Sequence, residues 1–189
     1  MSKGYSLGKR TFYYREIDST QEEIKRRIDD FDIEDGDVII ADLQTKGIGT
    51  HGRKWYTDEK DNIAFSMYIE VGKELNILDG ITIRIAEILK DILKDIYDVD
   101  LKIKEPNDLI LNDKKIAGIL TETKVISGNV KYIILGIGMN TNQLVFNEKI
   151  KFLATSVRKE TGTIIDNYKI INEFILRFEN ELNIRIGDK

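Results

Sequence analysis

Residues 42–57 read DLQTKGIGTHGRKWYT, and the rest of the chain can be placed around this stretch. It carries three of the fourteen glycines, the only histidine (His51), the only tryptophan (Trp55) and the cations Arg53 and Lys54. Glycines spaced this closely leave backbone N–H groups free to surround an anion, and the neighbouring cations add positive charge. We interpret the stretch as a loop that closes on a phosphate-bearing ligand.

Two predicted strands flank this loop. Residues 37–43 (DVIIADL) form a short apolar run that is typical of a buried strand. Residues 62–70 (NIAFSMYIE) alternate in polarity, which predicts a second strand with Ile63, Phe65 and Met67 on one face. The loop is therefore expected to hang between two strands of one sheet.

The other elements are predicted from the same periodicities. Ser19 and Glu22 have the spacing of a capping box, which predicts a helix that continues to about residue 31. Further strands are predicted at 11–17, on both sides of a turn at Asn112-Asp113 within 99–124, and at 130–138, and further helices at 79–97, from 154 onward and at 166–182.

Composition limits the class of protein. A chain of 189 residues fits a single domain (residues 1–189) that buries about 70% of its unfolded surface. The lack of cysteine excludes disulfides and thiolate metal sites, and a single histidine disfavours a zinc site. A net charge of −4 argues against a general nucleic-acid surface, and no apolar run could span a bilayer or form the core of a signal peptide. We expect a cytoplasmic protein that binds neither nucleic acid nor membrane.

Three features allow both a structural and a functional interpretation. Ser19 and Thr20 can cap a helix, but a helix N-terminus is also a polar surface for a ligand. Lys115 opens an apolar strand, where it either lies at a solvated strand end or acts in a site. Residues 136–142 (GIGMNTN) either end a strand in a turn or bring backbone close to a ligand.

Five stretches carry a resemblance to a known family. They are Ser19-Thr20-Gln21, Gln44-Thr45 with the loop 47–55, Lys104-Glu105-Pro106-Asn107-Asp108, residues 115–120 (KIAGIL) and residues 136–142 (GIGMNTN). In this order and spacing, over about residues 12–182, they resemble the biotin protein ligases (biotin to acetyl-CoA-carboxylase ligases).

This resemblance implies a fold and a reaction. The implied fold is an α/β (α+β) domain related to class II aminoacyl-tRNA synthetases, with a mainly antiparallel mixed sheet and helices packed on one face. The implied reaction uses ATP, Mg²⁺ and biotin to make biotinyl-5'-AMP, from which a lysine of a biotin carboxyl carrier domain takes the biotinyl group. Magnesium would be held through the phosphates and not by a protein cage. A homodimer through a sheet edge is also implied.

The resemblance also implies roles for individual residues. Lys115, Arg53 and Asp108 would be catalytic, with Lys115 beside the biotin carboxylate and α-phosphate and Asp108 positioned to orient or deprotonate the acceptor lysine. Biotin would be bound by Ser19, Thr20, Gln21, Gln44, Gly47, Gly49 and Gly118. ATP would be bound by Thr50, His51, Gly52, Arg53, Trp55, Lys104, Asn107, Lys115, Asn140 and Asn142.

The sequence departs from the family pattern at several places. Many relatives have arginine where this chain has Thr50, which suggests weaker retention of biotinyl-AMP and less selective labelling of lysines. Glu105 stands where tryptophan is common. Only eighteen residues precede Ser19, so we expect no DNA-binding domain and no operator binding, and we also expect most or all of the small C-terminal domain of most relatives to be absent.

Two other functions remain open. One is a lipoate or octanoate ligase, which would share the fold. The other is a module that binds biotin or its adenylate without turnover. For the ligase, we further expect the glycine loop to be mobile without ligand and ordered with it, because ordering about ten residues costs on the order of 10 kcal/mol.

Overall fold

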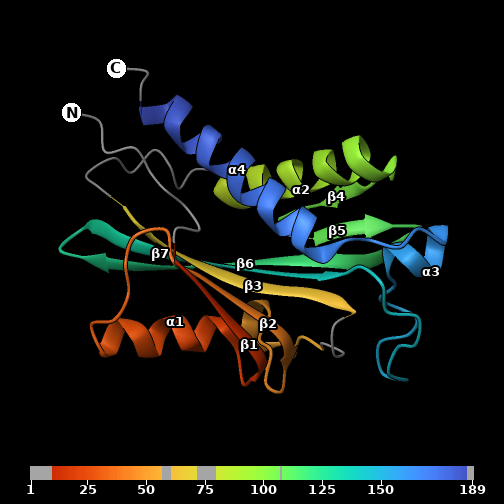
Figure 1. The fold of residues 1–189 in the computed structure, drawn as a ribbon, viewed down its shortest axis with the longest axis horizontal. Helices are drawn as coiled ribbons and strands as arrows, with labels where there is room; N and C mark the ends of the chain where they lie inside the picture. Colours follow the sequence, from red (N-terminus) through yellow and green to blue (C-terminus); the bar gives the residue numbers. More distant parts are fainter. Residues whose placement is uncertain (1–9, 57–60, 72–79, 107, 187–189) are drawn as a thin grey trace.

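A computed structural model describes residues 10–56, 61–71, 80–106 and 108–186 (Figure 1). Seven strands form one sheet, and helices pack against it. The strands are β1 (Thr11–Ile17), β2 (Val38–Gln44), β3 (Asn62–Glu70), β4 (Lys102–Lys104), β5 (Asp108–Leu111), β6 (Lys114–Ile126) and β7 (Asn129–Asn140). The helices are α1 (Thr20–Asp29), α2 (Ile81–Tyr97), α3 (Val157–Thr161) and α4 (Asn167–Ile186), with a 3-10 turn, η1, at Thr50–Gly52.

The sheet is mixed and mainly antiparallel, as predicted. Its strand order is β1-β2-β3-β7-β6-β5-β4. Only β1 and β2 pair in parallel among these strands, and every other neighbouring pair is antiparallel. The strand predicted at 130–138 is β7, which lies between β3 and β6 and so occupies the middle of the sheet.

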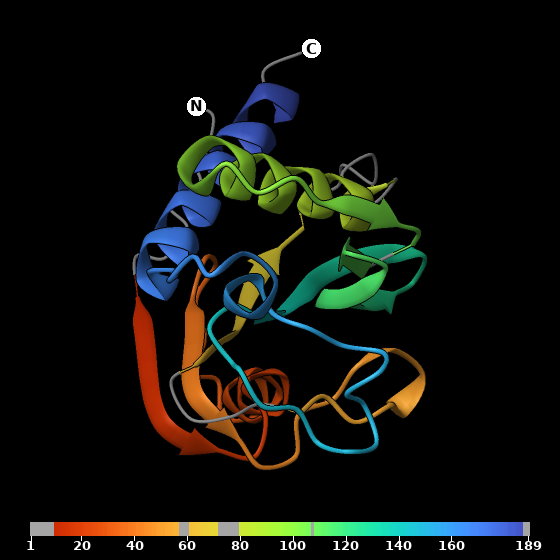
Figure 2. The same cartoon turned by 90° about the vertical axis from the view of Figure 1, so that its right-hand side faces the viewer.

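Helices cover both faces of the sheet, so the expectation of helices on one face is wrong. On one face, Ile24 of α1 packs against Ile39, Tyr68 and Ile134. On the other face, α2 and α4 bury a larger cluster that includes Phe174. Figure 1 shows α1 on one side of the sheet with α2 and α4 on the other, and Figure 2 looks along α1 from the end. Strands with both faces buried, such as β3, have nearly continuous apolar sequences.

The segment at 99–124 contains one more strand than predicted. The turn at Asn112-Asp113 is present, with φ of 49° and 62° at these residues, and it joins β5 to β6. The additional strand is β4, which pairs antiparallel with β5. Three residues are too few for a period of two to be recognised in the sequence.

None of the helices in the described ranges is long and apolar enough to cross a membrane. The loop after β2 and the segment after β7 lie at the same end of the molecule (Figures 1 and 2), where the loop shares one cavity with the N-terminus of α1 and another with that segment. This end of the sheet therefore brings together most of the motifs that the sequence singled out.

Candidate functional site

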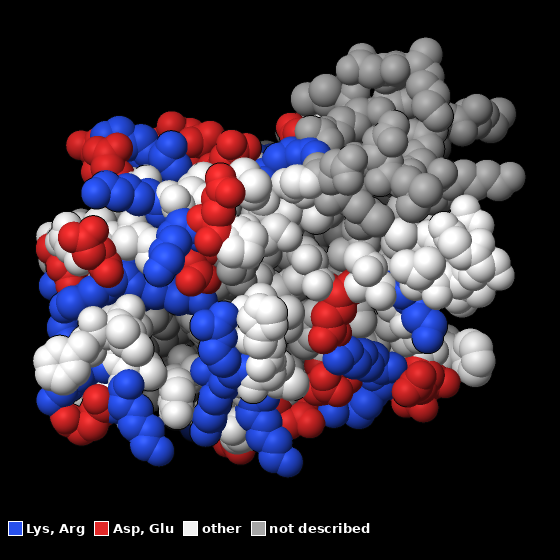
Figure 3. All heavy atoms as spheres, turned by 180° about the vertical axis from the view of Figure 1, so that it is seen from behind, with Lys and Arg blue, Asp and Glu red and all other residues white. Residues whose placement is uncertain are grey.

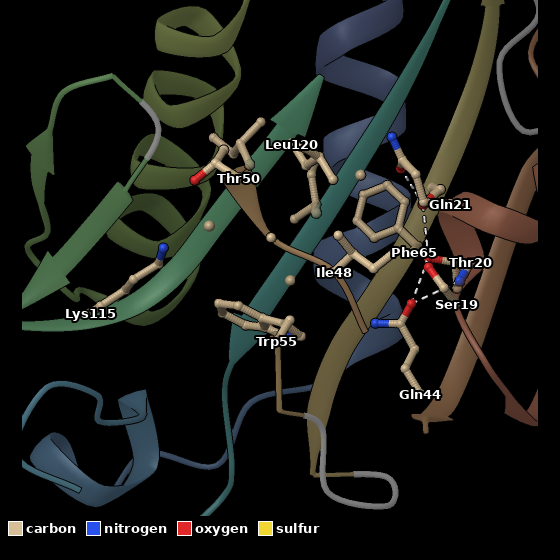
Figure 4. Close-up of a pocket in the computed structure, with 17 residues that line it drawn as sticks. Ser19, Thr20, Gln21, Gln44, Ile48, Thr50, Trp55, Phe65, Lys115 and Leu120 are labelled. Carbon is tan, nitrogen blue, oxygen red and sulfur yellow. Dashed lines mark hydrogen bonds between the residues drawn. The ribbon is translucent and has the colours of Figure 1, made fainter. Parts of the chain in front are cut away.

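Two neighbouring cavities lie at this end of the sheet. The inner cavity is bounded by the N-terminus of α1, the glycine loop and the facing parts of β3, β6 and β7 (Figure 4). The outer cavity is bounded by loop residues 49, 50 and 53–56, by Lys115 and Asn140, and by residues of the segment after β7. Gly49, Thr50, Trp55 and Lys115 line both cavities. These four shared residues mark the place where two parts of one ligand, or two ligands, would meet.

A chain of hydrogen bonds closes the inner cavity at its polar end. The Thr20 backbone N–H donates to Gln44 Oε1 over 2.8 Å, and Thr20 Oγ1 lies 2.8 Å from Ser66 Oγ. Ser66 donates to Gln21 Oε1 over 3.0 Å, and Gln21 Nε2 donates to the Ile134 carbonyl over 3.2 Å. Because Thr20, Gln21 and Ser66 are buried, these bonds hold fixed an array of neutral donors and acceptors.

Ser19 lies at the start of α1 but does not form the predicted capping box. Its backbone is extended, with φ of −158°, and its hydroxyl makes no capping hydrogen bond. Glu22 pairs instead with Lys25 over 2.7 Å. The Ser19 backbone N–H, which the Glu22 side chain would accept in a capping box, donates instead to Asp18 Oδ1 over 2.7 Å. The Ser19 side chain is buried at the inner cavity instead.

Asp18 fixes the N-terminus of α1 from the outside. Hydrogen bonds from Arg26, at 3.0 and 2.8 Å, lower the pKa of Asp18 to about 2. The same carboxylate accepts from the Ser19 backbone N–H over 2.7 Å. Asp18 therefore stays ionised at neutral pH and holds in place the turn from which Ser19 and Thr20 enter the cavity.

Glycines in β6 and β7 make room for two larger side chains. A Cβ atom on Gly136 would lie 2.5 Å from Gln21 Oε1, and one on Gly138 would lie 2.6 Å from Trp55 Nε1. Both distances are shorter than real side chains tolerate, so glycine is required while Gln21 and Trp55 keep these positions. The buried Trp55 Nε1 has no hydrogen-bond partner within the described structure, which leaves a donor for a ligand.

Lys115 and Asp108 form an ion pair where the two cavities meet. Lys115 Nζ lies 2.5 Å from Asp108 Oδ1, and both side chains are mostly buried. Asp108 Oδ1 is buried and has no other partner within the described residues, so the Lys115 ammonium balances its charge. The Lys115 backbone is held on both sides, since its N–H donates to Leu153 and its carbonyl accepts from Thr155.

The glycine loop folds back on itself. His51 and Gly52 have left-handed φ values of 58° and 70°, which reverse the chain after Thr50. Arg53 then donates to the Thr50 hydroxyl over 2.9 Å and to the Thr50 carbonyl over 3.2 Å. This places the Arg53 guanidinium at the outer cavity, which Thr50 also lines. A change in loop mobility on ligand binding stays a prediction.

Fourteen of the predicted site residues fall into three groups by position. The first group lines the inner cavity and consists of Ser19, Thr20, Gln21, Gln44, Gly49, Thr50, Trp55, Lys115 and Gly118. The second group, Arg53 and Asn140, lines only the outer cavity. Gly47, Gly52 and Asp108 lie beside these residues without lining either cavity.

Four further predicted residues are not placed in the cavities. Lys104 and His51 are exposed and line neither of them. The Asn142 amide donates to and accepts from the backbone of Ile165, over 2.9 and 2.8 Å, so its polar atoms are already used. Asn107 lies outside the described residues. The ligand roles of all four stay predictions.

The structure also brings in residues that the sequence did not assign. Ser66, Gly136 and Gly138 line the inner cavity, and Ile150 and Leu153 line the outer one. Ser66 could have been recognised as a polar residue within the apolar strand at 62–70. Gly136 and Gly138 belong to the stretch 136–142 (GIGMNTN), which the sequence already marks as a candidate ligand contact. Ile150 and Leu153 had no signal, because their place depends on how the segment after β7 folds.

Charge is unevenly distributed around this end of the molecule. The chain carries a net charge of −4, yet lysines and arginines are prominent in Figure 3 on the side that carries α3. Arg53, Lys54 and Lys115 line the outer cavity. Such a cationic wall suits a phosphate-bearing ligand. Within the described ranges, no three His, Asp or Glu side chains are grouped so that they could hold a metal ion.

Comparison with known proteins identifies relatives of this chain. A sequence model described as the Biotin/lipoate A/B protein ligase family matches residues 13–140. The bifunctional ligase/repressor BirA of Bacillus subtilis is 30% identical over 92% of this chain, which covers 54% of that protein. The Escherichia coli BirA is 30% identical over 79% of this chain and is covered to 46%. The chain thus spans about half the length of these relatives.

A solved structure of similar fold carries the ligands expected from the sequence. The biotin protein ligase from Aquifex aeolicus, in complex with biotin and ATP, superposes with a TM-score of 0.81 at 29% identity. The match covers 96% of this chain and 73% of that chain. Nearly the whole of this chain therefore has a counterpart in the fold of that protein.

Proposed function

The chain belongs to the biotin/lipoate A/B protein ligase family, and we propose that it is an ATP-dependent biotin protein ligase. In the first step, a carboxylate oxygen of biotin attacks the α-phosphorus of ATP, which gives biotinyl-5'-AMP and releases pyrophosphate. In the second step, the amine of a lysine attacks the acyl carbon, AMP leaves, and the amine proton is lost. The observation that carries this proposal is the position of Lys115 on the shared wall of two cavities.

The inner cavity suits the biotin end of the intermediate. Its closed end offers the neutral polar groups of Thr20 and Gln44, which can pair with an uncharged ureido ring. Its walls at Ile119, Leu120 and Trp55 are apolar and suit an aliphatic chain. If biotin enters this cavity with its ring first, its carboxylate would lie near Lys115.

The outer cavity suits the nucleotide. Arg53 and Lys115 supply positive charge for phosphates, and Leu153 and Trp55 supply apolar contact for a base. Magnesium would arrive with the ATP phosphates and keep phosphate and water oxygens as its main ligands. It would add positive charge where the pyrophosphate leaves.

Lys115 and Asp108 would act in different steps. Biotin carboxylate and the α-phosphate are both anions, so the ammonium of Lys115 between them reduces their repulsion in the first step. A phosphate that draws Lys115 away would release Asp108 from the ion pair. Asp108 could then accept the proton of the incoming lysine in the second step.

The acceptor would be a lysine on a biotin carboxyl carrier domain, in the cytoplasm. A homodimer through a sheet edge remains part of this proposal. Support for the acceptor comes from the names of relatives, such as the biotin--[acetyl-CoA-carboxylase] ligase of Mycobacterium tuberculosis, which is 29% identical over 58% of this chain.

Biotin-dependent exchange of pyrophosphate into ATP tests this proposal and separates it from the alternatives. Exchange that requires biotin supports the ligase. The family includes lipoate ligases, and exchange that requires lipoate or octanoate instead would identify this chain as one of them. Biotin binding without exchange would identify a binding module.

A further inference from the structure

Ser66 is a buried hydroxyl at the centre of the site, and none of the predicted roles includes it. It lies in β3 between Phe65 and Met67, and its exposed fraction is 1%. Its oxygen lies 2.8 Å from the Thr20 hydroxyl and 3.0 Å from Gln21 Oε1. A hydroxyl buried in an apolar strand is stable only when it is hydrogen-bonded, and these two bonds meet that need.

The proton count along this chain restricts how the hydroxyls can point. A serine or threonine hydroxyl has one proton to donate and two lone pairs to accept with. If the proton of Ser66 goes to Gln21 Oε1, then the proton of Thr20 can go to Ser66. If the proton of Thr20 goes instead to Gln44 Oε1, 3.1 Å away, then the 2.8 Å contact between the two hydroxyls needs the proton of Ser66, and Gln21 Oε1 loses its donor.

The first arrangement satisfies the buried Gln21 oxygen. Gln21 Nε2 is already fixed on the Ile134 carbonyl, so its amide cannot turn to replace the lost donor. Leaving a buried acceptor without a partner is costly. The bonds therefore run from Thr20 to Ser66 to Gln21, and the lone pairs of the Thr20 hydroxyl remain for a group in the cavity.

Gln44 offers a hydrogen-bond donor to the cavity, whereas Thr20 offers an acceptor. Its Oε1 accepts from the Thr20 backbone N–H, so its Nε2 is the atom left to donate, and Figure 4 shows this nitrogen directed away from Thr20. The closed end of the cavity thus offers an acceptor at Thr20 and a donor at Gln44. A ring that carries both an N–H and a carbonyl matches this pair, whereas a dithiolane or an alkyl end does not.

We propose that Ser66 is a positioning residue that orients the Thr20 hydroxyl to accept an N–H of the ligand, and so selects a ureido-bearing acyl group. This inference rests on the proposed function and adds a determinant of substrate choice to it. Ser66 itself acts through Thr20 and Gln21, not on the reacting atoms.

The test compares Ser66→Ala, Ser66→Cys and the wild-type protein in pyrophosphate exchange. We expect the KM for biotin to rise about tenfold in Ser66→Ala, equivalent to about 1.4 kcal/mol, with kcat changed less than about twofold. Ser66→Cys, with its weak donor, should lie between alanine and serine. With desthiobiotin, which keeps the ureido group, the KM of Ser66→Ala should rise by the same factor as with biotin.

Thr82→Val is the matched control. It removes a hydroxyl that lies 3.3 Å from Thr121 Oγ1, between α2 and β6 and away from both cavities. Its KM for biotin should equal that of the wild type, and thermal unfolding should show all variants folded at the assay temperature.

Several outcomes would overturn the inference. An unchanged KM in Ser66→Ala, or equal rises in Ser66→Ala and Thr82→Val, would show that Ser66 has no positioning role. If Ser66→Ala fails to fold, Ser66→Cys decides alone, and a wild-type KM there overturns the inference. A wild-type protein without biotin-dependent exchange would overturn the proposed function first and this inference with it.

Discussion

Lys115 Nζ lies 2.5 Å from Asp108 Oδ1, across the neighbouring strands β6 and β5. Each charge partly neutralises the other, and both are more than two-thirds buried. A ligand anion that enters the cavities competes with Asp108 for Lys115. The two side chains should therefore respond differently to substitution, and the two chemical steps provide the means to tell them apart.

Substitution of Lys115 by alanine should suppress adenylation far more than biotin binding. The ammonium is expected to matter most when the carboxylate and α-phosphate approach each other, so the exchange rate should fall about 100-fold to 1,000-fold. Biotin affinity, measured by calorimetry, should change much less. Lys114→Ala, at the adjacent residue of β6, is the control and should keep the wild-type rate. Near-normal exchange in Lys115→Ala would contradict the assignment.

Replacement of Asp108 by asparagine should affect the second step. This change keeps the shape of the side chain but removes the carboxylate that would accept the lysine proton, so transfer should slow by about 100-fold or more. Exchange should remain within a few-fold of the wild type. Single-turnover transfer from preformed biotinyl-AMP to a purified carrier domain measures the effect. Equal losses in exchange and transfer would show that Asp108 only holds Lys115 in place.

Thr50→Arg should strengthen the retention of biotinyl-AMP, the intermediate of the proposed reaction. One charge-assisted hydrogen bond contributes about 1.5 to 3 kcal/mol, so release of biotinyl-AMP should slow about tenfold to a hundredfold. Labelling of lysines outside the carrier domain should fall in parallel. Thr50→Ala removes the hydroxyl that Arg53 contacts without adding a charge, and it separates the two effects. Tight retention and strict selectivity in the wild type would contradict the prediction.

Gly138→Ala should disturb the site by a steric effect. The new Cβ would lie 2.6 Å from Trp55 Nε1 and 2.8 Å from Trp55 Cζ2, so the indole must move. Overpacking of this kind costs about 1 to 3 kcal/mol of unfolding free energy. Adding Trp55→Leu should recover most of that loss, as thermal or urea unfolding can show. Gly49→Ala, whose Cβ would meet only Arg53 O at 3.4 Å, should be tolerated.

Local sequence patterns predicted most of the sheet. The strands at 11–17 and 62–70 were found with these bounds, because runs of β-branched and aromatic residues favour strands, although β3 is buried on both faces. The short strand β4 and the second layer of helices were missed. They depend on which elements pair and which faces are covered, and neither is encoded within a short window of sequence.

The residues of the site were predictable where one short sequence motif supplies several neighbouring residues of a cavity wall. Thr20, Gln21 and Gln44 line the inner cavity because they stand at the start of α1 and the end of β2, which meet through the hydrogen bond to Gln44. Leu153 could not be predicted, since it reaches the outer cavity only after the segment following β7 folds back beside Lys115. Asn142 looked like a ligand in its motif, yet its amide is bound to the backbone at Ile165.

The central claim is that the two cavities joined at Lys115 bind biotin and ATP and link them. Pyrophosphate exchange into ATP, measured with the wild-type protein with and without biotin, tests it most directly. We predict exchange that depends on biotin, saturates with it and is lost in Lys115→Ala. Exchange that is absent with biotin, or that requires lipoate or octanoate in its place, would contradict the claim.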